Sequence, residues 1–174
     1  MLPVDASHHL NQSYVAEERG IFRGGLKCDI AKIDAAMLEL ANQDPNMRER
    51  LDILFSIPGI GMTTALMILV DMPENGALDS KQVASLAGLA PMSQSSGKWQ
   101  GKARIQSGRP NLRHAIFMPA LVAIRHNPDL KAKYDQLVAA GKEKKVAITA
   151  VMRKLLVLAN PLLRDHRKWT ENVG

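Results

Sequence analysis

The residues best suited to chemistry lie in one stretch of the chain that carries basic side chains and no acidic ones. No Asp or Glu occurs between Asp79 and Asp129. The 49 residues between them hold seven basic residues: Lys81, Lys98, Lys102, Arg104, Arg109, Arg113 and Arg125. Ordinary protein surfaces mix both signs of charge, whereas an acid-free stretch leaves its cations available to phosphate. We therefore predict that the five basic residues from Lys98 to Arg113 bind nucleic acid; the alternative is a basic loop without a ligand.

The same stretch contains a cluster of serines, Ser93, Ser95 and Ser96, followed by Gly97. A serine hydroxyl attacks phosphorus or a carbonyl carbon only when it is positioned and activated. The Gly-x-Ser-x-Gly elbow of many acyl-transfer enzymes is missing from the sequence. Phosphoryl transfer instead requires cations around the phosphate oxygens, and the downstream arginines suit that role. Taken alone, a loop serine is most often a turn residue.

A second candidate site is the glycine-rich turn Ile57-Pro-Gly-Ile-Gly between two predicted helices. Gly59 and Gly61 allow a sharp turn and a close approach of another backbone. The helix that follows, from Met62 through Thr63, presents unpaired N–H groups and the positive end of its dipole. The turn resembles the hairpin of the helix-hairpin-helix motif, which predicts DNA contacts at Gly59, Gly61 and Thr63. The alternative is a purely structural turn.

The elements around these sites are predicted to be mainly α-helical. Apolar residues at heptad-like spacing, from Leu26 to Leu40, predict a helix over 26–43 that forms either half of a coiled coil or one side of an intramolecular hairpin. Further helices are predicted over 45–56, 62–71, 80–87, 110–125, 128–140 and 143–163, with a kink or division at Pro119. The polar segment 91–109 is predicted to be a long basic loop with a small β-hairpin around 98–106. The predicted organisation is a weakly structured tail (1–25), a linker helix (26–43), a helical domain (44–168) and a second tail (169–174).

Composition narrows the class of protein further. The 174 residues are 46% hydrophobic and 23% charged, with a net charge of +6, so the chain can bury a core and favours a polyanionic partner. The single cysteine, Cys28, excludes an internal disulfide framework and a cysteine-rich zinc site. The longest uninterrupted apolar run, 65–70, is six residues long and predicts no membrane span. We expect a cytoplasmic protein.

Several of these runs, taken in order, resemble one family. They are Ser56–Gly61, Ala87–Pro91, Ser96–Arg109 and Leu112–Arg113, followed by Ala120–Ala123, Arg125–Pro128, Ala140–Lys142 and Met152–Leu156. Together they are similar to the transposases of the insertion sequence 110, 116 and 902 group. The resemblance covers about residues 26–165.

The resemblance implies a DNA recombinase that moves an insertion sequence. Members of the family carry an N-terminal RuvC-like domain with acidic residues, a helical linker and a C-terminal domain whose serine attacks the DNA backbone. By its place in the loop that serine matches Ser96, or Ser95 if the register is one residue off. The family works as an oligomer and uses a structured guide RNA to select its DNA.

The sequence departs from the family in one respect. The acidic domain is expected to be absent, because residues 1–25, which precede the linker helix, are too short to contain it. The resemblance therefore implies that the family's metal, Mg²⁺, lies outside this chain, and we expect a truncated or split transposase without a cofactor of its own. Its expected partners are DNA, guide RNA, and either further copies of itself or a full-length transposase. The alternatives are a non-catalytic nucleic-acid-binding remnant and an oligomerisation module.

Overall fold

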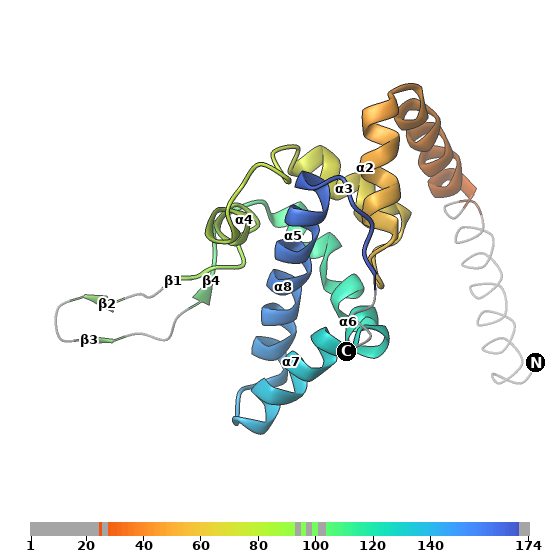
Figure 1. Cartoon of the computed structure of the whole chain (residues 1–174). Helices are drawn as coiled ribbons and strands as arrows, with labels where there is room; N and C mark the ends of the chain where they lie inside the picture. Colours follow the sequence, from red (N-terminus) through yellow and green to blue (C-terminus); the bar gives the residue numbers. More distant parts are fainter. Residues whose placement is uncertain (1–24, 26–27, 93–94, 97–98, 101–103, 171–174) are drawn as a thin grey trace, which may run out of the picture. The chain divides into compact units, whose positions relative to one another are not determined.

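The chain is mainly helical, as predicted, and one small antiparallel β-hairpin is inserted between two helices (Figure 1). The computed structural model describes residue 25 and residues 28–92, 95–96, 99–100 and 104–170. The chain divides into two units between Gln43 and Asp44. The helices of the second unit are α2 (Pro45–Phe55), α3 (Met62–Asp71), α4 (Ser80–Leu86), α5 (Pro110–Ala115), α6 (Phe117–His126), α7 (Pro128–Ala139) and α8 (Lys144–Arg164).

Local capping signals explain where three of these helices begin. The Asp44 carboxylate accepts a hydrogen bond from the N–H of Asn46 at the start of α2. Asp79 forms a capping box with Gln82 at the start of α4, in which each side chain bonds the other residue's backbone. Asn127 caps α7 through two backbone N–H groups. Each cap satisfies N–H groups that have no partner within the helix, so the predicted starting points are confirmed.

Helix α8 forms the centre of the second unit and contacts α2, α4, α6 and α7 (Figure 1). Its apolar side chains, including Val151, Leu155 and Leu156, are buried. By length and composition alone α8 could cross a membrane, although basic residues interrupt its apolar runs. Half of its apolar window is buried inside the unit, so core packing accounts for its apolar side.

Two predicted boundaries differ in the structure. The helix over 110–125 is divided, as predicted, but its two parts meet at Ile116, three residues before Pro119. Pro119 lies in the first turn of α6, where its missing N–H costs no helical hydrogen bond. The β-hairpin also begins earlier than predicted: β1 (Pro91–Met92) pairs with β4 (Arg104–Ile105), and β2 (Ser95–Ser96) pairs with β3 (Trp99–Gln100). Its Ser- and Gly-rich sequence lacks the alternating pattern that would have marked these strands.

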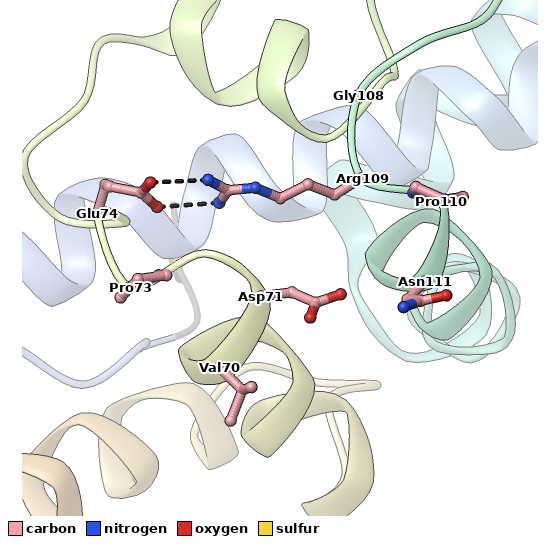
Figure 2. A pocket seen from close by; sticks show the side chains of 8 residues that line it. All are labelled: Val70, Asp71, Pro73, Glu74, Gly108, Arg109, Pro110 and Asn111. Carbon is pink, nitrogen blue, oxygen red and sulfur yellow. Dashed lines mark hydrogen bonds and ion pairs between the residues drawn. The ribbon is translucent and has the colours of Figure 1, made fainter.

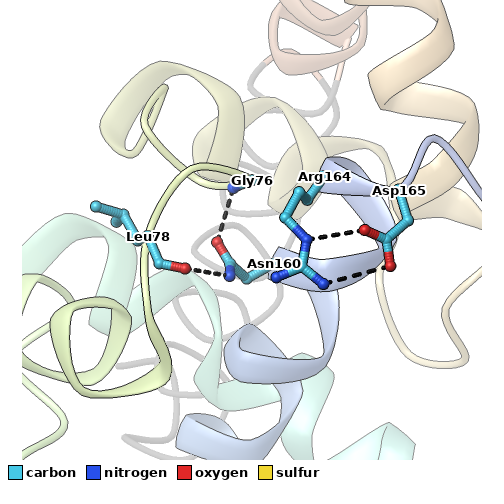
Figure 3. A network of polar contacts seen from close by, with 5 residues as sticks. All are labelled: Gly76, Leu78, Asn160, Arg164 and Asp165. Carbon is cyan, nitrogen blue, oxygen red and sulfur yellow. Dashed lines mark hydrogen bonds and ion pairs between the residues drawn. The ribbon is translucent and has the colours of Figure 1, made fainter.

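The loop between α3 and α4 is tied to α8 by one buried side chain, Asn160 (Figure 3). The Asn160 Oδ1 accepts a hydrogen bond from the Gly76 N–H at 2.7 Å, and its Nδ2 donates to the Leu78 carbonyl at 2.6 Å. From the other side, Arg50 on α2 donates to the carbonyl oxygens of Pro73 and Asn75 at 2.9 and 2.8 Å. The loop therefore has little freedom to move relative to the helices.

In the first unit, residues 28–43 form a helix. Its apolar stripe is exposed: Ile30 by 51%, Ile33 by 59% and Leu40 by 67%. The choice between half of a coiled coil and one side of an intramolecular hairpin stays a prediction. Leu26, the first residue of the predicted stripe, lies outside the described residues.

Candidate nucleic-acid interface

The candidate nucleophile lies on the β-hairpin of residues 91–105, which we call the basic hairpin. Ser96 is the last residue of β2, and its backbone pairs with Trp99 across the hairpin. Ser95, the alternative nucleophile, pairs with Gln100. The hairpin connects α4 to α5, and every described residue whose exposure is known in it is exposed: Pro91, Met92, Arg104 and Ile105. The exposure of these four residues leaves both ends of the hairpin open to a large ligand such as DNA.

The basic residues predicted to bind phosphate fall into two groups. Arg104 lies in β4 and is exposed, while Lys98 and Lys102 belong to the hairpin but lie outside the described residues. Arg109 and Arg113 follow the hairpin, the first as the N-cap of α5 and the second in its last turn, and both are engaged within the protein. The Arg113 guanidinium donates to the carbonyl oxygen of Ser107 at 2.8 Å.

Arg109 forms a two-pronged ion pair with Glu74 (Figure 2). Its two terminal nitrogens donate to the two Glu74 carboxylate oxygens at 2.9 and 2.7 Å. These hydrogen bonds are the main reason that the pKa of Glu74 falls from 4.5 to about 2, and the same contact raises the pKa of Arg109. The expectation that the acid-free stretch leaves all its cations free is therefore wrong for Arg109, because a carboxylate from outside the stretch reaches it.

Two glycines bring the base of the hairpin against the end of α4. Gly88 and Gly108 both have positive φ, +66° and +67°. A Cβ on Gly108 would overlap the backbone of Gly88 and approach the Leu86 carbonyl oxygen to 2.7 Å. The N–H of Arg109 donates to the same Leu86 carbonyl at 2.9 Å. Only glycine permits both this backbone conformation and this close approach.

The ion pair also borders an open pocket of about 470 Å³ between the end of α3 and the start of α5 (Figure 2). Its lining includes Val70, Asp71 and Asn111 in addition to the ion-paired residues. Asp71 adds a further attraction that raises the pKa of Arg109. The pocket therefore carries both signs of charge around one arginine.

The glycine-rich turn between α2 and α3 combines a buried and an exposed part. Ile57 and Ile60 are buried, while Gly61 and Thr63 are exposed. Gly59 has φ +99°, and a Cβ there would lie 2.6 Å from the Pro119 carbonyl oxygen on α6. Gly61 is the N-cap of α3 in ordinary extended backbone, and nothing lies within 4 Å of a Cβ built on it. The requirement for glycine therefore falls on Gly59, where it serves packing against α6.

The start of α3 is nevertheless suited to an anion. No side chain caps the helix, so its first N–H groups and the positive end of its dipole have no protein acceptor from the N-cap. Gly61 and Thr63 lie at this exposed end. A DNA phosphate could take the place of the missing cap.

Sequence reasoning missed Glu74, the residue that organises the base of the hairpin. Glu74 precedes Arg109 by 35 positions and lies just outside the acid-free stretch. No spacing rule links the two residues, because their contact depends on the packing of α3 against α5. Within the residues that the structure describes, no three His, Cys, Asp or Glu side chains come together as a metal site.

Comparisons with known proteins identify relatives for most of the chain. Residues 51–135 match the family described as "Transposase IS116/IS110/IS902 family". The chain is 34% identical over 148 residues to the "Pilin gene-inverting protein" of Moraxella bovis, an alignment that covers 83% of this chain and 46% of that protein. It is 31% identical over 143 residues to the "Insertion element IS900 uncharacterized 42 kDa protein" of Mycobacterium paratuberculosis, covering 74% of this chain and 34% of the relative. A protein of insertion element IS110 from Streptomyces coelicolor is 31% identical over 115 residues, covering 65% and 28%. The chain thus spans less than half the length of each of these relatives.

Proposed function

Because this chain belongs to the IS116/IS110/IS902 family of transposases, we propose that it is the DNA-binding and strand-transfer part of a serine-dependent recombinase. One relative is named for the inversion of a pilin gene, and others belong to insertion elements. The inversion of a gene requires DNA to be cut and rejoined. The observation that carries the proposal is the acid-free basic hairpin, whose ends are exposed and whose strand β2 ends at Ser96, inside the matched residues.

In the proposed reaction the Ser96 hydroxyl oxygen attacks a phosphorus atom of the DNA backbone. A bond forms between Oγ and phosphorus, and one phosphorus–oxygen bond of the DNA breaks. The hydroxyl proton leaves the serine, and the departing deoxyribose oxygen takes up a proton. The resulting phosphoserine link conserves the energy of the phosphodiester bond, so a second DNA end can reverse the step and be joined.

Basic residues of the hairpin hold the DNA in this proposal. Arg104 is exposed in β4 and has no acidic neighbour in sequence, and Lys98 and Lys102 add two further cations on the same hairpin. Arg109 and Arg113 lie next to them but are already hydrogen-bonded to protein atoms. The uncapped start of α3, at Gly61 and Thr63, offers a second phosphate contact.

The family resemblance supplies the proposed partners. They are a structured guide RNA, an acidic RuvC-like domain and further copies of the transposase. Mg²⁺ held by that acidic domain would supply charge stabilisation at the phosphate. The residues described here bind and orient the DNA, and we place the reaction in the cytoplasm.

Trapping a covalent protein–DNA adduct tests the proposal. The full chain is mixed with its acidic domain as a separate polypeptide, guide RNA and labelled DNA, and adducts are separated on denaturing gels. We expect an adduct whose phosphorylated peptide contains Ser96, and Ser96→Ala should abolish it while leaving DNA binding intact. Ser95→Ala is the matched control, since it removes a neighbouring hydroxyl from the same strand.

Two of the alternatives have distinct outcomes in this experiment. An adduct that survives Ser96→Ala and disappears in Ser95→Ala would move the nucleophile by one residue. DNA binding without any adduct would make the chain a non-catalytic binding protein.

A further inference from the structure

We infer that Glu74 and Arg109 act as a positioning pair that fixes the direction in which the basic hairpin, and with it Ser96, leaves the helical unit. The inference rests on the function proposed above for Ser96. It concerns two residues that are outside the hairpin and do not touch the proposed reacting atoms.

Both ends of the hairpin are fixed to α4. On the outgoing side Leu89 is buried, and its N–H and that of Ala90 both donate to the Ala84 carbonyl, at 2.8 and 3.0 Å. On the returning side Gly108 lies against Gly88, and the Arg109 N–H donates to the Leu86 carbonyl. These contacts, together with the hydrogen bond from Arg113 to Ser107 beside Gly88, hold the base of the hairpin at one place, the C-terminal end of α4.

The Glu74–Arg109 pair adds a second, independent point of support. Glu74 lies on the loop that follows α3, and Arg109, four residues after the hairpin, is the N-cap of α5. The Glu74 loop is itself held by Asn160 on α8 and Arg50 on α2. The guanidinium therefore connects the base of the hairpin to a loop supported by two of the longer helices. With this second support, the hairpin can no longer rotate freely about its contacts with α4.

The exposure of the pair argues that stability is not its main contribution. The side chains of Arg109 and Glu74 are 31% and 43% exposed. Ion pairs that water can reach contribute little to folding stability. A two-pronged arginine–carboxylate contact instead contributes geometric restriction. Because misplacing a reacting group by about 1 Å can cost roughly a hundredfold in rate, that restriction matters most where a nucleophile extends from an exposed hairpin.

The pair also gives a simple reason why Arg109 is not a phosphate ligand. Both prongs of its guanidinium are occupied by Glu74, and Asp71 lies in the same pocket (Figure 2). A phosphate would have to displace one carboxylate and approach another. If Arg109 were nevertheless a DNA ligand, removing Glu74 would free it and strengthen DNA binding.

Four variants of the full chain separate these roles. They are Glu74→Gln, Arg109→Gln, the exchanged pair Glu74→Arg with Arg109→Glu, and Glu39→Gln, which removes an exposed carboxylate from the other unit. Three quantities are measured on each variant: the rate of adduct formation at saturating DNA, the affinity for DNA with its salt dependence, and the rate of trypsin cleavage after Lys98, Lys102 and Arg104. Circular dichroism checks that each variant is folded.

We expect both single variants of the pair to slow adduct formation by about tenfold or more, and to speed trypsin cleavage of the hairpin. Their DNA affinity should stay within about twofold of Glu39→Gln, because no phosphate contact is lost. The exchanged pair should restore most of the rate, which a general loss of packing would not allow.

Other results would overturn the inference. A lower salt dependence in Arg109→Gln, together with tighter binding in Glu74→Gln, would make Arg109 a DNA ligand. Unchanged adduct rates in both single variants would show that the pair does not position Ser96. A wild-type chain that forms no adduct would contradict the proposed function itself. The positioning role would fall with it, and unchanged trypsin cleavage in the same samples would show that the pair does not hold the hairpin either.

Discussion

The helical part of residues 44–170 and the basic hairpin that emerges from it are held in place in different ways. In the helical part the side chains that define the fold are buried, such as Leu54, Leu112 and Leu155, each with no exposed surface. In the hairpin the described side chains are exposed, including Met92 by 47% and Ile105 by 37%. Apolar burial therefore fixes the first region, whereas the hairpin depends on backbone pairing and on polar contacts at its base. We therefore expect a substitution in the helical part to change the free energy of unfolding, and a substitution in the hairpin to change DNA binding.

The largest effect is expected from a core truncation. Leu155→Ala on α8 removes a fully buried side chain, so the free energy of unfolding should fall by about 2–5 kcal/mol. The matched hairpin variant Ile105→Ala should change it by less than about 0.5 kcal/mol, because the side chain is exposed. Urea denaturation followed by circular dichroism measures both. Equal losses would contradict the separation of the two regions.

The glycine-rich turn between α2 and α3 allows a sharper test, because it holds one closely packed glycine and one with open space around it. Gly59→Ala would force a side chain into a left-handed conformation and against the Pro119 carbonyl, so we expect a loss of about 2–3 kcal/mol. Gly61→Ser places a favourable N-cap residue in extended backbone with open space around it, and stability should stay the same or rise by a few tenths of a kcal/mol. Denaturation curves compare the two folding effects. A DNA titration of Gly61→Ser then shows whether phosphate needs a bare glycine at the start of α3.

The sequence predicts the helical part well because its signals are local. Asp44, Asp79 and Asn127 each cap a helix through residues two or three positions away, and such signals can be seen without a structure. The mainly α fold follows from them. The break predicted at Pro119 lies at Ile116, because a proline fits the first turn of a helix as well as a break, and the sequence alone does not decide between these.

The candidate site was predicted less completely because its contacts are long-range. Its basic residues and Ser96 could be found from charge and resemblance. The partner of Arg109 could not, since Glu74 is 35 residues away and reaches it only after α3 packs against α5. The positive φ of Gly88 and Gly108 was equally hidden, because only the meeting of the two backbones requires it.

A third prediction concerns the hairpin alone. Replacing Lys98, Lys102 and Arg104 together with Ala should lower the slope of DNA affinity against salt concentration by up to about three units, roughly one for each lost phosphate contact. Stability should change by less than about 0.5 kcal/mol. Fluorescence anisotropy at several salt concentrations gives the slope. The control is Lys131→Ala, Lys144→Ala and Lys145→Ala, which removes three exposed charges at α7 and α8. If both triple variants lose the same slope, the hairpin has no special role in binding.

The smallest expected effect tests the contact that joins the two regions. In the folded chain the pKa of Glu74 lies at about 2, below its ordinary value of 4.5, chiefly because of the hydrogen bonds from Arg109. A carboxylate with a lowered folded pKa stabilises the fold above its unfolded pKa, and it loses that contribution as the pH falls through the folded value. The difference in free energy of unfolding between wild type and Glu74→Gln should therefore be constant from about pH 5 to pH 7 and shrink between about pH 4.5 and pH 2.

Urea titrations at intervals of half a pH unit measure this difference, with Glu39→Gln as the control for the loss of one carboxylate. A difference that grows as the pH falls would mean that protonated Glu74 is the stabilising form. Since the pair is exposed, 1 M salt should also reduce the difference. A measurable but small difference of this kind is what a contact at the edge of the core should give, because the helices keep their packing without it while the base of the hairpin loses its second support.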